Sequence, residues 1–381
     1  MAYFDNAATS YPKPEQVYKF MDEFYRSNGG NVGRGSYTLA NNAKLLVDDT
    51  RTRLQRLLHC PNKQIIFEPT ATIALNTIIQ GLVLSDAKNI YISPFEHNAV
   101  TRTLHHLEQS AKIKIHILNV TRDLDYDLKR IKYQFDATQP DVVIISHASN
   151  MIGLVAPVEK IFELAKRYRA VTIVDMAQTA GLIDLNVGSE TIDFAIFAGH
   201  KTLLAPTGIA GFIMNPSIKL PPIIFGGTGF DSANPNVPDR LPERFEVGTL
   251  NIIGIAGLNA ALDWIETQTL ARIRSLELNN RHRLLELLSA HDCLSIVGNI
   301  VGREYVGIVS CTIEGISSES AGNFFAAKGI AVRAGLQCAP LAHKFLGTYP
   351  DGTVRFSVNC FTTDDDFAQL RSVLDELDEE L

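Results

Sequence analysis

The sequence predicts an α/β fold with two parts: a large domain built on a mostly parallel sheet covered by helices, and a smaller α+β domain after it. Two observations predict this fold. Short apolar, β-branched runs alternate with amphipathic segments over the first part of the chain, and such continuously apolar strands are typical of parallel sheets buried on both faces. Nearer the end of the chain, apolar and polar residues alternate, as in a half-exposed sheet.

The elements of the large domain follow from these runs. Helices are predicted over 72–84 and 158–169; in the second, Ile161 and Leu164 fall on one face and Lys160 on the other. Helices are common crossovers between parallel strands. The predicted strands are 65–68, 89–93, 114–118, 142–146, 171–175, 194–198 and 209–214.

A stretch rich in Pro, Gly and Asn, residues 216–242, interrupts this pattern and is predicted to be a functional loop or a subunit contact. Helices 252–267 and 270–289 follow it. A small sheet is then predicted from 295–297, 306–312, 332 and 353–358. We therefore expect a large domain over 15–265 and a small domain made of 1–14 and 266–381.

Composition narrows the class of protein. A net charge of −7 and the lack of a basic stripe argue against nucleic-acid binding. The first residues do not form a signal peptide, and no uncharged apolar stretch approaches the ~18 residues of a membrane helix. The five cysteines are scattered without a C-x-x-C pair, so we expect no disulfide framework, no metal site and a cytoplasmic location.

The strongest chemical signal is Lys201 in the phrase Gly-His-Lys, directly after the apolar run 194–198. The run 171–175 ends in Asp175. A lysine and an aspartate at neighbouring strand ends suit pyridoxal 5'-phosphate, because the amine can form a Schiff base with the aldehyde while the carboxylate keeps the ring nitrogen protonated. A lysine in this apolar setting is less expected as an ordinary surface charge.

Other candidate residues follow the ends of predicted strands. Thr70-Ala71-Thr72 opens the helix after 65–68, where free amides and hydroxyls can bind phosphate, although a threonine there is also a common N-cap. His97 can stack on a ring or move protons, and more often such a histidine is polar surface. Asn150 is placed to bind a carboxylate or a ring hydroxyl, and Gln178 the same hydroxyl.

Near the end of the chain, Arg333 and Arg355 flank Cys338 in a segment with Gly, Gln and Pro. The guanidiniums suit a carboxylate, and the thiol is a possible nucleophile. A single cysteine is usually a small buried hydrophobe, and that is the prediction for the other four. These are Cys60, Cys293, Cys311 and Cys360.

The motifs together resemble the class V aminotransferase family of pyridoxal-phosphate enzymes, and within it the cysteine desulfurase and selenocysteine lyase branch. The resemblance covers nearly the whole chain and implies a fold-type-I enzyme with a mixed, mostly parallel sheet. It is carried by Tyr3-Phe-Asp-Asn-Ala-Ala-Thr-Ser10, Thr70-Ala-Thr72, Glu96-His97-Asn98, Val174-Asp-Met-Ala-Gln178, Gly199-His-Lys201, Arg244-Phe-Glu-Val-Gly-Thr249, Arg333-Ala-Gly-Leu-Gln-Cys338-Ala and Gly352-Thr-Val-Arg355.

The resemblance implies a role for each candidate. The roles toward the cofactor are as follows: Lys201 attaches it, Asp175 pairs with the ring nitrogen, His97 stacks on the ring, Gln178 bonds the ring hydroxyl, Ala71, Thr72 and His200 hold the phosphate, and Thr249 reaches the phosphate of a partner subunit in a homodimer. Toward the substrate, Asn150, Arg355 and Arg333 bind the carboxylate, and Cys338 attacks the sulfur and keeps it as a persulfide.

Two departures from the family pattern stand out. Ala198 occupies a position where the family often has Ser or Thr, so one phosphate hydroxyl is missing. Leu336 and Gln337 stand where the desulfurase branch often has two histidines. The short spacing around Cys338 resembles the branch with an ordered cysteine loop, which implies a protein as sulfur acceptor.

The expected function is a homodimeric cysteine desulfurase that converts L-cysteine, or a related amino acid, to alanine. A selenocysteine lyase or another class V lyase or aminotransferase stays open as the alternative, and a thiol at Cys338 favours the first. A sulfur carrier without turnover does not need Lys201 and Asp175. A nucleotide-binding dehydrogenase is disfavoured because no G-x-G-x-x-G follows the first strand.

Overall fold

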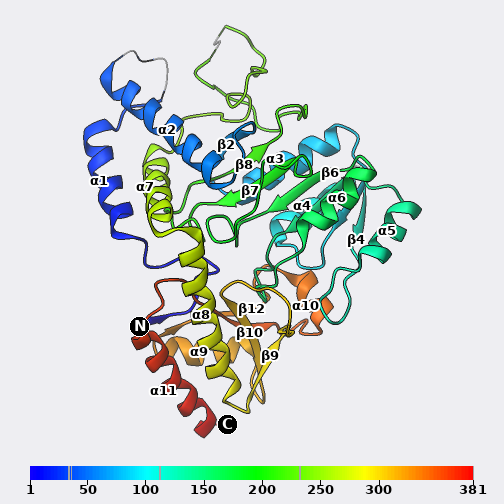
Figure 1. Ribbon diagram of the computed structural model, residues 1–381, viewed down its shortest axis with the longest axis vertical. Coiled ribbons are helices and arrows are strands. Elements are labelled where there is room, and N and C mark those ends of the chain that lie inside the picture. The colour runs from blue at the N-terminus through cyan, green and yellow to red at the C-terminus, as the bar shows by residue number, and fades with distance from the viewer. Residues whose placement is uncertain (33–34, 36, 111–112, 231–232, 381) are drawn as a thin grey trace.

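The structure is a computed structural model that describes residues 1–32, 35, 37–110, 113–230 and 233–380. Two lobes lie one above the other in Figure 1, and both labelled chain ends belong to the lower, smaller lobe. Within the described residues, no helix combines the length and the apolar character that a membrane crossing requires.

A seven-stranded sheet forms the centre of the large lobe. Six strands run in one direction and β8 runs against both of its neighbours. The strands are apolar and largely buried because helices cover both faces of the sheet. In spatial order they are β2 (Gln64–Glu68), β8 (Ala210–Met214), β7 (Phe194–Ala198), β6 (Val171–Asp175), β5 (Val142–Ser146), β3 (Asn89–Ile92) and β4 (Lys114–Ile117).

Alternate side chains of each strand enter two separate cores, as the two-residue repeat of a strand requires. In β5, Ile144 packs in one core, with α3 (Ala71–Leu84) and α4 (Asn98–Ser110). Its neighbour Ile145 packs in the other core. The helices of the large lobe that contribute to this second core are α1 (Glu15–Asn28), α2 (Thr38–Leu57), α5 (Leu128–Ala137), α6 (Val158–Arg167) and α7 (Ile252–Gln268), and α8 (Leu270–Ser289) and α10 (Pro340–Leu346) of the small lobe add Ile273 and Ala342.

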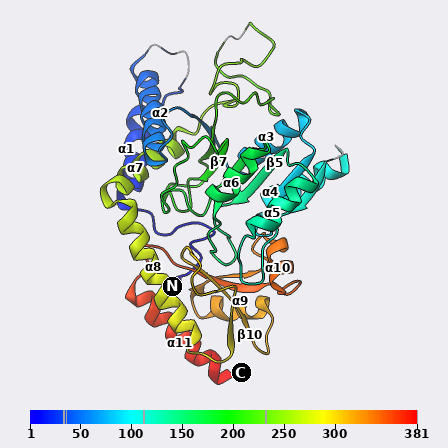
Figure 2. The same ribbon diagram turned by 45° about the vertical axis from the view of Figure 1, so that its right-hand side comes forward.

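The small lobe begins with α8 (Leu270–Ser289), which leads from the end of α7 down into the lower lobe in both views (Figures 1 and 2). An antiparallel sheet and three helices build the rest of it. In spatial order the strands are β12 (Arg333–Gly335), β13 (Thr353–Ser357), β10 (Ile308–Ile313) and β9 (Leu294–Val297), and the helices are α9 (Ser318–Ala327), α10 (Pro340–Leu346) and α11 (Asp364–Glu380).

The first residues of the chain belong to the small lobe. β1 (Ala2–Tyr3) pairs in parallel with β11 (Ile330–Ala331), and Asp5 bridges to Ser357 of β13. Phe4 is fully buried against the rings of Phe356 and Phe367, which fixes this segment to the core. The pairing agrees with the grouping of residues 1–14 with the small domain, and the domain bounds themselves stay a prediction.

The predicted α/β fold is confirmed, and the predicted strands of the large sheet all occur, with ends shifted by at most one residue. The run 209–214 begins one residue later, at Ala210, although the carbonyl of Ile209 still accepts from Gly199 N in register with the β7–β8 pairing. The small sheet differs more: β12 begins after residue 332. The stretch 216–242 contains no helix or strand in its described part, and 231–232 lie outside the described residues.

Candidate active site

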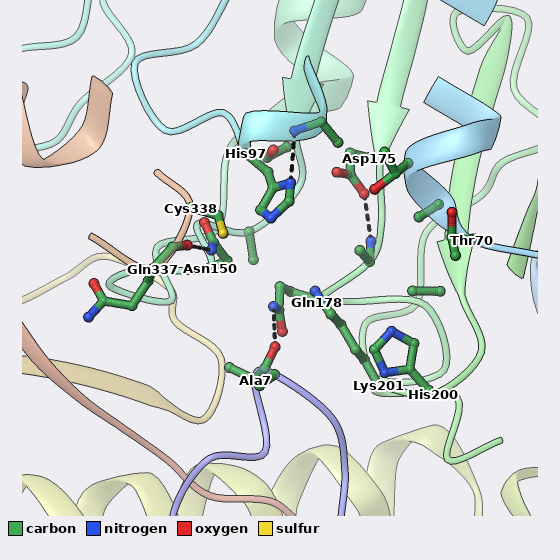
Figure 3. Close-up of a pocket in the computed structure, with 18 of the residues that line it drawn as sticks. Ala7, Thr70, His97, Asn150, Asp175, Gln178, His200, Lys201, Gln337 and Cys338 are labelled. Carbon is green, nitrogen blue, oxygen red and sulfur yellow. Dashed lines mark hydrogen bonds between the residues drawn. The ribbon is translucent and has the colours of Figure 1, made fainter. Parts of the chain in front are cut away.

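A cleft of about 390 Å³ opens at the carboxyl ends of the parallel strands and extends to the small lobe. This is the edge where ligands bind in sheets of this kind. Figure 3 shows Gln337 and Cys338 on one side, Asp175 and Thr70 on the other, and His97 and Lys201 between them. The predicted site residues that line it are Ala71, Thr72, His97, Asn150, Asp175, Gln178, His200, Lys201, Arg333, Cys338 and Arg355.

Asp175 and Lys201 meet because β6 and β7 are neighbours. Asp175 is the last residue of β6, and Lys201 lies in the turn that follows β7. The Oδ1 atom of Asp175 accepts from Ala177 N at 2.9 Å. Burial raises the pKa of Asp175, and the nearby ammonium of Lys201 opposes this. Burial also lowers the pKa of Lys201 to about 8, so the amine is mainly an ammonium at neutral pH but loses its proton far more readily than an ordinary lysine.

His97 lies just before α4 and is held as a neutral imidazole. Its Nδ1 accepts from Ala99 N at 3.0 Å, so in the neutral ring the proton lies on Nε2. Burial, reinforced by the charges of Lys201 and Arg355, lowers its pKa to about 4. The ring therefore presents an N–H donor and an uncharged face to the cleft across the neutral pH range.

The opposite end of the cleft can hold an anion. Thr70 is the N-cap of α3, and its Oγ1 accepts from Ile73 N at 3.2 Å. The two amides before Ile73, those of Ala71 and Thr72, can bind a ligand. His200 adds a buried Nδ1 that has no hydrogen-bond partner among the described residues. Thr70 is therefore an N-cap, as one of the two sequence interpretations had it, and it lines the cleft together with Ala71 and Thr72.

Sequence reasoning missed how closely the segment 5–13 surrounds the lysine. The backbone of Ser10 donates to His200 O at 3.0 Å, and its hydroxyl donates to Lys201 O at 2.6 Å. Gln178 was predicted to reach a ring hydroxyl; its Nε2 donates to Ala7 O at 2.9 Å. The segment contains no apolar run that predicts a strand or helix, and only its similarity to the opening motif of the family indicated that it is functional.

The guanidinium of Arg355 is almost fully buried beside Asn150. Its Nη1 donates to Asn150 O at 2.8 Å, and its Nη2 donates to Asp5 Oδ1 at 3.0 Å. Arg333 donates to the other oxygen of Asp5 at 2.6 Å. The Nε of Arg355 and the Oδ1 of Asn150 are buried without a partner among the described atoms. Asp5, which was not predicted, is therefore the carboxylate that holds both arginines.

Cys338 is the one exposed cysteine, and it lies in the cleft. Its backbone carbonyl accepts from Asn98 N at 2.7 Å. Cys60 and Cys311 are buried, as predicted. The prediction of burial was wrong for two others, which are only partly buried: the Cys293 thiol donates to Asp378 at 3.1 Å, and Cys360 lines a small cavity between the lobes.

Glu96 is a further residue that the sequence did not single out as functional. Its carboxylate is fully buried and accepts from Ser93 Oγ at 2.6 Å and from Ser146 N and Oγ at 2.7 and 2.8 Å. Burial raises its pKa to about 7, and the charge of Asp175 adds to the rise. Glu96 therefore fixes the end of β5 next to Asp175 and His97, although it does not line the cleft itself.

Thr249 lies outside the cleft. It is exposed and lines a separate hollow with Glu68 and Glu246, both of which are carboxylates. The predicted role of Thr249 in a partner subunit's site stays a prediction.

The side chains around the cleft fit pyridoxal phosphate on their own chemistry. Lys201 supplies an amine, Asp175 a carboxylate, and the first turn of α3 free amides. His200, Asn150 and Arg355 line the same cleft, and each has a buried polar atom without a partner among the described residues, as expected where a polar ligand is missing. An α/β sheet with this arrangement at its carboxyl edge has the architecture of fold type I, the fold of many pyridoxal-phosphate enzymes.

The sequence profile of the aminotransferase class-V family matches residues 2–370, and the chain belongs to that family. It is 30% identical to a probable cysteine desulfurase of Halalkalibacterium halodurans over 100% of this chain and 93% of the relative. It is 29% identical to a cysteine desulfurase of Escherichia coli O157:H7, over 89% and 84% of the two chains. The apo structure of a cysteine desulfurase from Thermococcus onnurineus superposes with a TM-score of 0.88 at 29% identity, covering 100% and 95%.

Proposed function

We propose that this chain is a pyridoxal-phosphate-dependent cysteine desulfurase that converts L-cysteine to L-alanine and keeps the sulfur as a persulfide on Cys338. The observation that carries the proposal is the exposed thiol of Cys338 in the same cleft as Lys201, Asp175 and Arg355. Relatives named as cysteine desulfurases, similar over nearly the whole chain, support it.

The cofactor supplies, when bound, a conjugated system that takes up the electron pair left on the substrate. Lys201 would hold it through Nζ, and the same amine is placed to move protons at the substrate carbons. Asp175 keeps a proton on the ring nitrogen. The neutral imidazole of His97, which lines the cleft, would pack against the ring and exclude water from it. Ala71, Thr72 and His200 bind the phosphate.

The substrate carboxylate binds to Arg355 and Asn150, which both line the cleft, and Arg355 Nε is a buried donor without a partner among the described atoms. The Arg355 N–H can donate to a carboxylate oxygen, and Asn150 Nδ2 has a second N–H for the carboxylate while the first donates to Gln337 O. Arg333, half exposed at the rim, adds a second positive charge. These contacts orient the amino acid so that its side chain points toward Cys338.

The sulfur step balances as a transfer between two thiols. The Cys338 thiolate attacks the substrate sulfur, an S–S bond forms, and the C–S bond of the substrate breaks with its electron pair left on carbon. That carbon takes up a proton and is reduced to the methyl group of alanine. The sulfur is oxidised to the sulfane level and stays on Cys338 as a persulfide until an acceptor thiol, on a partner protein, attacks it.

We also propose a homodimer with a cytoplasmic location. Thr249 is exposed away from this chain's own cleft, which suits a residue that completes the site of a second copy. The stretch 216–242 exposes Phe225 and the neighbouring Ile224, large apolar side chains that a subunit contact would cover.

The test is persulfide formation on a single thiol. The holoenzyme is mixed with L-cysteine, its thiols are alkylated, and peptides are assigned by mass spectrometry. We expect a persulfide on Cys338 alone, and loss of alanine production in Cys338→Ala with the visible absorbance of the bound cofactor unchanged. Cys293→Ala, which removes a partly buried thiol far from the cleft, is the matched control. Alanine production at the parent rate by Cys338→Ala removes the proposed function and favours a lyase that needs no thiol, such as one for selenocysteine.

A further inference from the structure

The side chain next to the proposed nucleophile, Gln337, is buried and fully hydrogen-bonded. Its Nε2 donates to Thr353 O at 2.8 Å and to Arg333 O at 3.2 Å. Its Oε1 accepts from Thr353 Oγ1 at 3.2 Å and lies 2.9 Å from His343 Nε2. One amide therefore ties the cysteine turn to β12, β13 and α10, three elements that surround it.

The two carbonyl groups fix the orientation of this amide. A carbonyl only accepts hydrogen bonds, so the Gln337 atom that faces both of them is the nitrogen, and the atom that faces His343 is the oxygen. His343 Nε2 must then donate, which leaves Nδ1 to accept from Thr348 Oγ1 at 2.8 Å. Burial lowers the pKa of His343 to about 4, so the ring stays in this neutral form across the neutral range.

The turn that Gln337 anchors has an unfavourable backbone. Gln337 and Cys338 are consecutive non-glycine residues with φ of +40° and +57°. Side chains in this left-handed region need compensation from the surroundings. Two hydrogen bonds from the large lobe stabilise the turn, because Asn150 Nδ2 donates to Gln337 O at 2.6 Å and Asn98 N donates to Cys338 O at 2.7 Å. The hydrogen bonds of the Gln337 side chain stabilise it from the small lobe.

We propose that Gln337 is the positioning residue for the Cys338 thiol, and that it acts as an uncharged clamp rather than as an acid or base. The proposal rests on the proposed function insofar as it concerns sulfur transfer. Where the desulfurase branch often has an ionisable histidine, this chain has an amide whose donors and acceptors are all engaged within the protein. The geometry of the nucleophile is therefore set by hydrogen bonds that no neutral-range titration breaks.

The first test replaces the amide by an apolar side chain of similar length, Gln337→Met. Peptide-resolved hydrogen exchange on the holoenzyme should rise about tenfold or more at Asn98, whose amide donates to the cysteine turn. Exchange at Gly307 is the internal control. Its amide donates to Glu277, makes no contact with the Gln337 hydrogen bonds described above, and should exchange at an unchanged rate. The single-turnover rate of persulfide formation should fall about tenfold or more while the spectroscopic affinity for L-cysteine changes less than about twofold.

The second test keeps the shape and adds a titration, Gln337→Glu. A protonated carboxyl can donate to the carbonyl of Thr353 and accept from His343, whereas a carboxylate faces the carbonyls of Thr353 and Arg333 without a donor. The ratio of its persulfide rate to that of the parent should therefore rise as the pH falls, with a new ionisation that the parent lacks. A packing role alone would move the unfolding temperature without producing this pH profile.

Each result decides the proposal. Persulfide formation by Gln337→Met within about twofold of the parent rate, or slow formation with unchanged exchange at Asn98, overturns it. A rate ratio for Gln337→Glu that is flat with pH also overturns it, and this variant decides the matter if the methionine variant does not fold. If the parent makes no alanine from cysteine, the proposed function fails, and the exchange at Asn98 still decides whether Gln337 fixes the turn.

Discussion

The substitution Asp5→Asn removes the negative charge that faces Arg355 and Arg333 in the cleft, and it keeps the shape of the side chain. Asp5 holds Arg355 at 3.0 Å and Arg333 at 2.6 Å. The Arg355 side chain is only 4% exposed, so water cannot replace the lost carboxylate there. Burial lowers the pKa of Arg355, and the charge and hydrogen bond of Asp5 oppose that effect.

The size of the effect follows from this burial. Two unit charges ~4 Å apart interact by about 4 kcal/mol at an effective dielectric constant of about 20. Removing one partner of a buried pair costs about 3–5 kcal/mol. The asparagine oxygen retains one hydrogen bond, worth about 1 kcal/mol. We therefore expect the free energy of unfolding to fall by about 3 kcal/mol in Asp5→Asn.

Urea denaturation of the holoenzyme, with and without L-alanine, measures the free energy of unfolding of the parent and of Asp5→Asn. L-Alanine carries the same α-carboxylate as the proposed substrate, so it should stabilise Asp5→Asn more than it stabilises the parent, because its carboxylate compensates the charge on Arg355. Asp22→Asn, which breaks an exposed Asp22–Arg26 pair in α1, is the control and should have almost no effect. A loss no larger than the control, or an equal response of both proteins to L-alanine, would refute this account of Asp5.

Three other outcomes are expected. Attachment of pyridoxal phosphate to the cofactor-free protein should speed up as the pH rises through about 8 and then level off, because only unprotonated Lys201 attacks the aldehyde; a rate still rising above about pH 10 contradicts the lowered pKa of Lys201. Asp175→Asn should still bind the cofactor but lose turnover on the order of a hundredfold or more, since a neutral partner does not keep the ring nitrogen charged; near-normal turnover would exclude that role. Glu96 has a folded-state pKa of about 7 against 4.5 in the unfolded chain. Its contribution to the free energy of unfolding therefore falls by about 3 kcal/mol as the pH rises from the lower value to the higher. Glu96→Gln, which mimics the protonated form, should flatten that part of the pH dependence of urea denaturation, and parallel curves for the two proteins would count against the raised pKa.

The sequence was most informative where chemistry follows a strand end. Asp175 and Lys201 could be paired in advance, because apolar runs mark β6 and β7 and neighbouring parallel strands end at one edge. Cys338 could be separated from the other cysteines by its Gly- and Pro-containing surroundings, and it alone is exposed. In both cases the neighbouring residues alone are enough to predict where the side chain lies.

The residues that were missed act through contacts between distant parts of the chain. Asp5 reaches Arg355 across most of the sequence, and Gln337 satisfies its amide with groups from β13 and α10. No local periodicity encodes such partners. Cys293 shows the converse error: its apolar character suggested burial, whereas its thiol donates to Asp378 at the surface of the small lobe.

The pairing of β1 with β11 has a consequence for the order in which the protein is made. Ala2 finds its partner Ile330, and Asp5 its partners on β13, only after more than three hundred further residues have left the ribosome. Until then Phe4 has no core to enter, and Ser10 cannot be placed against Lys201 by that core. The large lobe is built from contacts closer in sequence and can form first. Lys201 is therefore enclosed last, by a segment that was synthesised before the whole of the large lobe.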